Sequence, residues 1–236
     1  MGMPPPEIIG GALRDAGAKA IIVSLDKRSG GTSPQEFLRF TKEQARARIL
    51  VPGPLPVIWN DFVVHKIQIT QAAAYGASGI TLWSDLLEPE LLKEFIDECK
   101  RLNLEPIVMV KNLEECKLAL DFKARCLCMH TLEESELLSL REKLPNDPNI
   151  SYMARLRPEA DFSIYGEIDL AWVLRDHGFN CIWPSPEAIF ATGMQDMYSA
   201  VSAMKSKASR LFVSPRQFMM DRMKEGAKEY LGDILY

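Results

Sequence analysis

The feature that most constrains this chain is a regular alternation of short apolar, β-prone runs with longer stretches of helical periodicity. Seven runs predict strands: Ala20–Leu25, Pro56–Trp59, Gly79–Trp83, Glu105–Val110, Arg125–Met129, Ile150–Ala154 and Asn180–Pro184. Helices are expected near Glu7–Ala16, Pro34–Ile49, His65–Tyr75, Glu88–Leu102, Leu113–Phe122, Leu132–Leu144, Ile168–His177 and Met194–Ser209. Such alternation indicates βα units around a parallel sheet, and 236 residues suit one α/β barrel.

The start of the chain departs from a complete barrel. It opens with prolines and a predicted helix, so the strand that should come first in an eight-stranded barrel is missing. We therefore predict the α/β class and a TIM (β/α)8-type barrel that lacks its first strand. We divide the chain into a barrel, residues 1–209, and a C-terminal tail with a helix, residues 210–236.

Composition excludes several function classes. A formal net charge of −4 provides no basic field, which makes nucleic acid and anionic membranes poor partners. No apolar run approaches the roughly 20 residues that span a bilayer, and the first residues lack the pattern of a signal peptide. The five cysteines lie in apolar or helical stretches and indicate buried thiols in a reducing compartment. We expect a soluble protein of the cytoplasm or of an organellar matrix such as the plastid stroma.

Three segments carry a family resemblance. They are 16–26, which contains Ala16-Gly17-Ala18 and Ile22-Val23-Ser24-Leu25-Asp26; 54–62, Pro54-Leu55-Pro56-Val57-Ile58-Trp59-Asn60-Asp61-Phe62, followed by Gln68-Ile69; and 104–120, with Leu104-Glu105-Pro106-Ile107-Val108, Glu114 and Ala119-Leu120. Their order and spacing resemble the motifs GA-x-AISVLTD, LPVL-x-KDF…QI and LG-x-x-x-LVEVH…E…AL of indole-3-glycerol phosphate synthase. The resemblance covers residues 7–205, and it implies that enzyme's barrel fold and its place in tryptophan biosynthesis.

The family's reaction is a decarboxylating ring closure of a carboxyphenylamino-deoxyribulose phosphate. The resemblance implies a lysine general acid on the third strand of the complete barrel, a Glu-x-Lys pair on the first and a glutamate on the fifth. Asn, Glu and Ser groups on strands six to eight complete the set. Protons must move to and from oxygen and carbon, which requires side chains with tunable pKa values facing the substrate.

This chain departs from the family at those positions. Asn60 stands where the resemblance places the lysine, and an amide is no general acid near neutral pH. Met109 stands at the fifth-strand glutamate, His130 at the sixth-strand asparagine and Arg155 at the seventh-strand glutamate. The first-strand pair has no counterpart. We therefore predict no catalytic residues and the loss of the family's reaction.

The phosphate cradle is altered as well. Pro184 and Ser185 occupy the Gly-Ser position whose backbone N–H groups would hold phosphate, and proline has no N–H to donate. Asn60, His130, Arg155 and Ser185 would converge at the barrel mouth. They are our candidate ligand-binding residues for a sugar phosphate, with His130 as a base and Arg155 as an anion clamp. The alternative is that these residues only fill the mouth by bonding to one another.

No metal or cofactor is predicted. Cys126, Cys128 and His130 point the same way on one strand, but steps of about 6.5–7 Å do not converge on one tetrahedral ion. Trp59 should point outward beneath a helix as part of the core.

Two functions from different classes follow. The first is a noncatalytic barrel that acts as a structural or interaction subunit of a larger assembly, because a missing strand leaves two unpaired edges. The second is retained synthase activity, or another small-molecule lyase that uses His130 and Arg155. The gap could be closed by the β-prone run Leu211-Phe212-Val213 after a right-handed crossover, or by a partner or an N-terminal segment.

Overall fold

The strands form one curled parallel sheet. The computed structural model describes residues 4–27, 30–130, 132–157, 164–190 and 194–205. Seven strands are hydrogen-bonded in chain order: β1 (Ile21–Ser24), β2 (Val57–Asn60), β3 (Gly79–Trp83), β4 (Glu105–Val110), β5 (Cys126–Met129), β6 (Ser151–Arg155) and β7 (Cys181–Trp183). Each pair is parallel, which confirms a TIM-type barrel with seven of its eight strands among the described residues.

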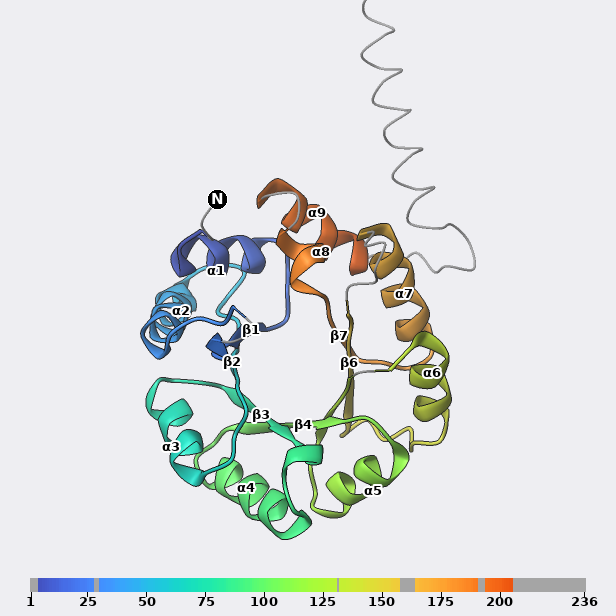
Figure 1. The fold of residues 1–236 in the computed structure, drawn as a ribbon. Coiled ribbons are helices and arrows are strands. Elements are labelled where there is room, and N and C mark those ends of the chain that lie inside the picture. Colours follow the sequence, from blue (N-terminus) through green and yellow to red (C-terminus); the bar gives the residue numbers. More distant parts are fainter. Residues whose placement is uncertain (1–3, 28–29, 131, 158–163, 191–193, 206–236) are drawn as a thin grey trace, which may run out of the picture.

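The helices surround the sheet (Figure 1). They are α1 (Pro6–Asp15), α2 (Pro34–Arg46), α3 (Lys66–Ala74), α4 (Pro89–Arg101), α5 (Leu113–Asp121), α6 (Glu134–Glu142), α7 (Ile164–Asp176), α8 (Pro186–Phe190) and α9 (Met194–Met204), with 3-10 turns at Ala47–Ile49 and Ser84–Leu86. The short α8 was not predicted, and α7 begins four residues earlier than Ile168. In the part of the chain that the structure describes, no helix combines the length and the apolar character needed to cross a bilayer.

Side chains alternate between two apolar layers, because successive strand residues point to opposite faces. Trp59 points outward and is buried, with its ring centre 4.8 Å from that of Phe37 in α2 and 5.9 Å from that of Tyr75, as predicted. The inward residues form a second cluster that includes Ile58, Met109 and Cys128. The barrel interior is therefore packed with side chains rather than hollow.

Local signals explain where the helices begin. Ser33 caps α2 by accepting a hydrogen bond from the backbone of Glu36 at 3.2 Å, and the Glu36 side chain accepts one from the Ser33 backbone at 3.0 Å. His65 Nδ1 accepts from the backbone of Ile67 at the start of α3. Such caps fix the connections that follow the C-terminal ends of β1 and β2, at the mouth of the barrel.

Within the residues that the structure describes, no strand joins β1 to β7. Leu25 N–H donates to the Asn60 carbonyl, so the alternate residues Ile22 and Ser24 turn their backbone groups away from β2. The outer layer is continuous there, because α9 packs against α1 and receives a hydrogen bond from Trp172 Nε1 of α7 at Ala203 O (Figure 1). The helices are thus in contact across a gap in the strands.

Side chains next to the gap are less buried than those elsewhere in the sheet. All three residues of β7 are partly exposed, and so are Ile22 and Ser24 of β1, whereas every residue of β2 and β5 is buried. The proposed closing run Leu211-Phe212-Val213 and the whole tail, residues 210–236, lie outside the described residues. The boundary at residue 209 therefore stays a prediction.

Candidate functional site

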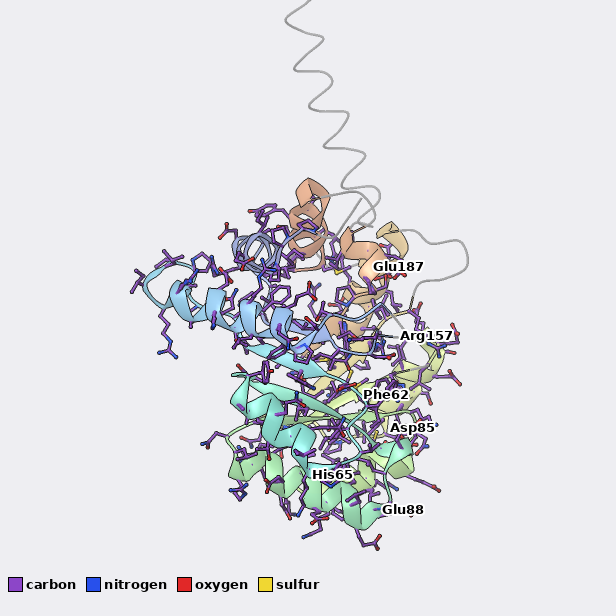
Figure 2. All side chains as sticks on the ribbon, turned by 60° about the vertical axis from the view of Figure 1, so that its left-hand side comes forward. Phe62, His65, Asp85, Glu88, Arg157 and Glu187 are labelled. Carbon is purple, nitrogen blue, oxygen red and sulfur yellow. The ribbon has the colours of Figure 1, made fainter. Side chains whose placement is uncertain are left out.

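The candidate site is the mouth, where the C-terminal ends of the strands meet the connections to the helices. Figure 2 labels residues that follow the C-terminal ends of four strands: Phe62 and His65 after β2, Asp85 and Glu88 after β3, Arg157 after β6 and Glu187 after β7. Parallel strands bring all their C-terminal ends to one edge, so residues far apart in the sequence meet there.

Five side chains form what we call the mouth cluster: Phe62, Trp83, His130, Arg155 and Trp183. The ring centre of Trp83 lies 5.1 Å from that of Phe62 and 4.8 Å from that of the buried His130. The guanidinium carbon of Arg155 lies over two indoles, 5.6 Å from the centre of Trp83 and 4.7 Å from that of Trp183. The structure therefore brings His130 and Arg155 together around Trp83.

The Asn60 side chain is hydrogen-bonded to the neighbouring strand β3. Its side chain is buried, and its Oδ1 accepts a hydrogen bond of 3.0 Å from Thr81 Oγ1 on β3. The same hydroxyl lies 3.4 Å from the backbone carbonyl of Asp61. Asn60 thus uses its side-chain acceptor to join β2 to β3.

Ser185 is hydrogen-bonded to α7 and α8, and its convergence with the other candidates stays a prediction. It is 0% exposed, its N–H donates to Glu167 Oε2 at 3.1 Å, and its hydroxyl donates to Glu167 Oε1. The hydroxyl oxygen also accepts from the Ala188 N–H, which caps α8. The physical reason is that β7 ends at Trp183, and the chain turns at once into α8 above a buried carboxylate of α7.

Met109 fills the interior at the position of the family's fifth-strand glutamate. It is 0% exposed and pairs in register with Cys128 of β5. Burial raises the pKa of the Cys126 thiol to about 12 and that of Cys128 well above its usual value, so both are protonated at neutral pH. The centre of the barrel beneath the mouth cluster therefore carries no charge at these positions.

Desolvation dominates the electrostatics of the mouth. It lowers the pKa of His130, and the nearby Arg155 charge acts in the same direction, while Asp85 and Glu115 oppose it. Burial also lowers the pKa of Arg155, which nevertheless stays charged because a guanidinium titrates far above neutral pH. His130 is therefore the neutral imidazole beside a permanent cation.

The depressed pKa of His130 predicts a pH dependence of stability. As the pH falls through about 6.5, the unfolded chain binds a proton that the folded site resists, so stability decreases. Replacing the ring in His130→Asn should remove this part of the loss. Urea unfolding of both proteins at pH 7.5 and 5.5 should show a smaller loss in the variant, and equal losses would contradict the assignment.

The candidate residues from the sequence did not include two members of the mouth cluster. Trp83 and Trp183 both contact Arg155. The available signal was their position at the last inward-facing place of β3 and β7, where a large flat ring must border the mouth.

The sequence is similar to known enzymes over its first half. A family model described as indole-3-glycerol phosphate synthase matches residues 6–134, which is more than half of the chain. An indole-3-glycerol phosphate synthase of Aquifex aeolicus is 38% identical over 112 residues, 48% of this chain and 40% of that protein. The enzyme of Leptospira interrogans is 32% identical over 126 residues, 53% and 46% of the two chains. The match thus spans less than half the length of these relatives.

Solved structures show the same fold at low identity. One described as native KDPGal superposes with a TM-score of 0.61 at 16% identity, covering 86% of this chain and 88% of the other. The thiamine phosphate pyrophosphorylase of Pyrococcus furiosus gives a TM-score of 0.58 at 19% identity with the same coverage. At such identities the likeness concerns the barrel alone.

Proposed function

The chain belongs to the indole-3-glycerol phosphate synthase family, and on that premise we propose that it is a noncatalytic member whose barrel serves as a structural or interaction subunit. The observation that supports the proposal is the buried methionine at position 109. A thioether that is 0% exposed occupies the place where the family resemblance implies a glutamate facing the substrate.

The remaining mouth groups do not supply the missing proton transfers. Asn60 is an amide whose oxygen is bonded to Thr81, and it has no proton to exchange near neutral pH. His130 is held neutral by desolvation, so it lacks the proton that a general acid must donate. Positions 60 and 130, which both differ from the family, therefore do not support ring closure with decarboxylation.

The connections around the mouth favour an interaction role. Phe62, Val64 and Ile67 follow β2, and Leu86 follows β3, the neighbouring strand. Their exposed fractions run from 43% to 67%, and all four follow the C-terminal ends of two paired strands. Soluble proteins usually cover such side chains with a partner surface.

The second candidate is an active small-molecule lyase of the same family, in tryptophan biosynthesis or beside it. One observation favours it: a neutral imidazole lies next to the cationic Arg155, and such a pair could accept a proton and hold an anionic substrate. This candidate requires His130 to act as the base.

A turnover assay separates the two candidates. We expect the full chain to form no indole product from the family's deoxyribulose phosphate substrate, while the Aquifex aeolicus relative assayed in parallel does. Turnover that disappears in His130→Asn would establish the lyase and overturn our proposal.

The interaction role is tested by measuring the native size of the protein from its source, which should show an assembly. The double variant Phe62→Ser with Ile67→Ser should disrupt that assembly. The control variant Ile8→Ser, at a position on α1 that is 47% exposed, should leave it intact.

A further inference from the structure

We propose that copies of this chain associate head to tail, with the mouth end of one barrel docked on the opposite end of the next. The inference rests on the interaction role proposed above and names the partner as a second copy of the chain. Two exposed apolar surfaces form the contact. We call them the rim patch, which is Phe62, Val64, Ile67 and Leu86, and the base patch, which is Ile49, Leu50 and Val51.

The base patch lies at the end of the barrel away from the mouth. Helix α2 leads the chain from the mouth back to the start of β2, so Arg46 at its end and the turn that follows reach the opposite end. In that turn Ile49 and Val51 are 90% and 99% exposed, the largest fractions among the large apolar side chains that the structure describes. Leu50 between them is 49% exposed. Consecutive apolar side chains in water indicate a surface that a partner covers.

A groove next to the base patch can receive side chains of the partner. It lies between the ends of α2 and α3, has a volume of about 540 Å³, and has Leu38, Leu55 and Tyr75 among its apolar walls. Lys42 and Arg48 line it as well, and no carboxylate is among its described lining residues. The groove therefore suits large apolar side chains that come from an acidic surface.

The free charge at the base patch is positive, although the whole chain carries a formal charge of −4. Lys42, Arg46 and Arg48 are all exposed, and none of them forms an ion pair within the part of the chain that the structure describes. Glu43, which lies among them on α2, is already paired with Arg14 at 2.7 Å. Three unpaired cations thus border the three exposed aliphatic side chains.

The rim patch joins two connections at the mouth. The ring centre of Phe62, after β2, lies 5.1 Å from that of Trp83 at the end of β3. Lys66 at the start of α3 forms an ion pair with Glu94 of α4. These contacts hold the two connections against each other, so their exposed apolar side chains present one surface. Figure 2 shows Phe62 and Glu88, one from each connection, on the same side of the barrel.

The free charge at the rim patch is negative. Glu88 and Glu90 at the start of α4 are exposed, and neither forms an ion pair within the described residues. The lysines of this region are already neutralised, Lys66 by the ion pair above and Lys111 by Asp85 at 3.0 Å. A rim patch therefore attracts a base patch, whereas two rim patches would bring like charges together. This favours contact between unlike ends over a symmetric contact between two mouths.

A contact between unlike ends repeats. Each copy that docks its rim patch keeps its base patch free, so the copies build a closed ring or an open chain rather than a symmetric dimer. The association should weaken with salt, because its charged groups are exposed to solvent.

Analytical ultracentrifugation of the purified full chain over a range of concentrations tests the proposal. We expect species larger than a dimer that dissociate in about 0.5 M salt. The base variant, Ile49→Ser with Val51→Ser, and the rim variant, Phe62→Ser with Ile67→Ser, should each weaken self-association by roughly tenfold or more. An equimolar mixture of the two variants should form a dimer and nothing larger, because one intact rim patch and one intact base patch remain. Ile8→Ser should behave like the unmodified chain.

Each other outcome overturns the proposal in a recognisable way. A dimer that the rim variant loses and the base variant keeps would mean symmetric contact between mouths. A mixture that stays monomeric while the unmodified chain associates would mean that the two patches do not meet. If the base variant does not fold, Lys42→Glu with Arg48→Glu takes its place in the mixture.

A purified chain that is monomeric at every concentration would also overturn the proposal, and two further measurements then show what remains. If the protein from its source lies in an assembly that the rim variant disrupts, the interaction role stands with a different partner. If that protein is monomeric too, the interaction role fails as well. Binding of the monomer to vesicles of anionic lipid that the base variant abolishes would assign the base patch to a membrane surface instead.

Discussion

Restoring the family's carboxylate through Met109→Glu is expected to destabilise the protein strongly and to restore no activity. Met109 is 0% exposed within the inward cluster, so the introduced carboxyl would have to ionise in an apolar interior. We expect a loss of about 3 kcal/mol or more in the free energy of unfolding at pH 7. Burial should raise the pKa of the introduced group, so the loss should shrink as the pH falls toward about 4.3.

Met109→Leu is the matched control, because it keeps the volume without the charge and should cost less than about 1.5 kcal/mol. Urea unfolding of both variants at pH 7 and pH 5 gives the comparison. Adding Asn60→Lys should not produce turnover either, since it removes the bond to Thr81 and the first-strand pair still has no counterpart. Detectable ring closure by the double variant would contradict this prediction, because it would show that the barrel mouth can still catalyse the reaction.

Most of the barrel could be predicted because its strands are short, apolar and bounded by polar turns. Gly79–Trp83 and Glu105–Val110 were predicted with the observed bounds. The start of α7 was misplaced because Gly166 interrupts the apolar pattern that Ile168 begins. The helix α8 has five residues, which is too short for a helical period to appear in the sequence.

The sequence predicts the position of a site residue only where that residue lies on a strand, because side chains alternate between the two faces there. Asn60 and Arg155 end their strands at inward positions, and both lie at the mouth. Ser185 comes after β7 has ended, where alternation no longer applies, and a carboxylate from α7 holds it instead. That contact joins residues 18 apart, with most of α7 and all of β7 between them, and no periodicity in the sequence encodes it.

The gap between β1 and β7 predicts a selective reactivity of Cys181. This residue lies on β7 and is partly exposed, while Cys99, Cys116, Cys126 and Cys128 are buried. Buried thiols react with alkylating reagents only when the structure opens, so we expect Cys181 to be labelled at least about tenfold faster than the other four. Mass spectrometry of the native full chain during alkylation at pH 8.5 measures this, and Cys181→Ala should abolish the fast label.

The same measurement on a chain that ends at residue 205 identifies what covers the gap. Cys181 packs beside Met153 at the open side of the sheet, so a strand that paired with β7 would shield its thiol. Equal fast labelling in both chains would mean that the gap is open to solvent and that the tail does not close it. Faster labelling in the shorter chain would place the tail over β7. Labelling of Cys181 that is as slow as that of Cys99 in both chains would contradict the prediction, because the edge of β7 would then be covered without the tail.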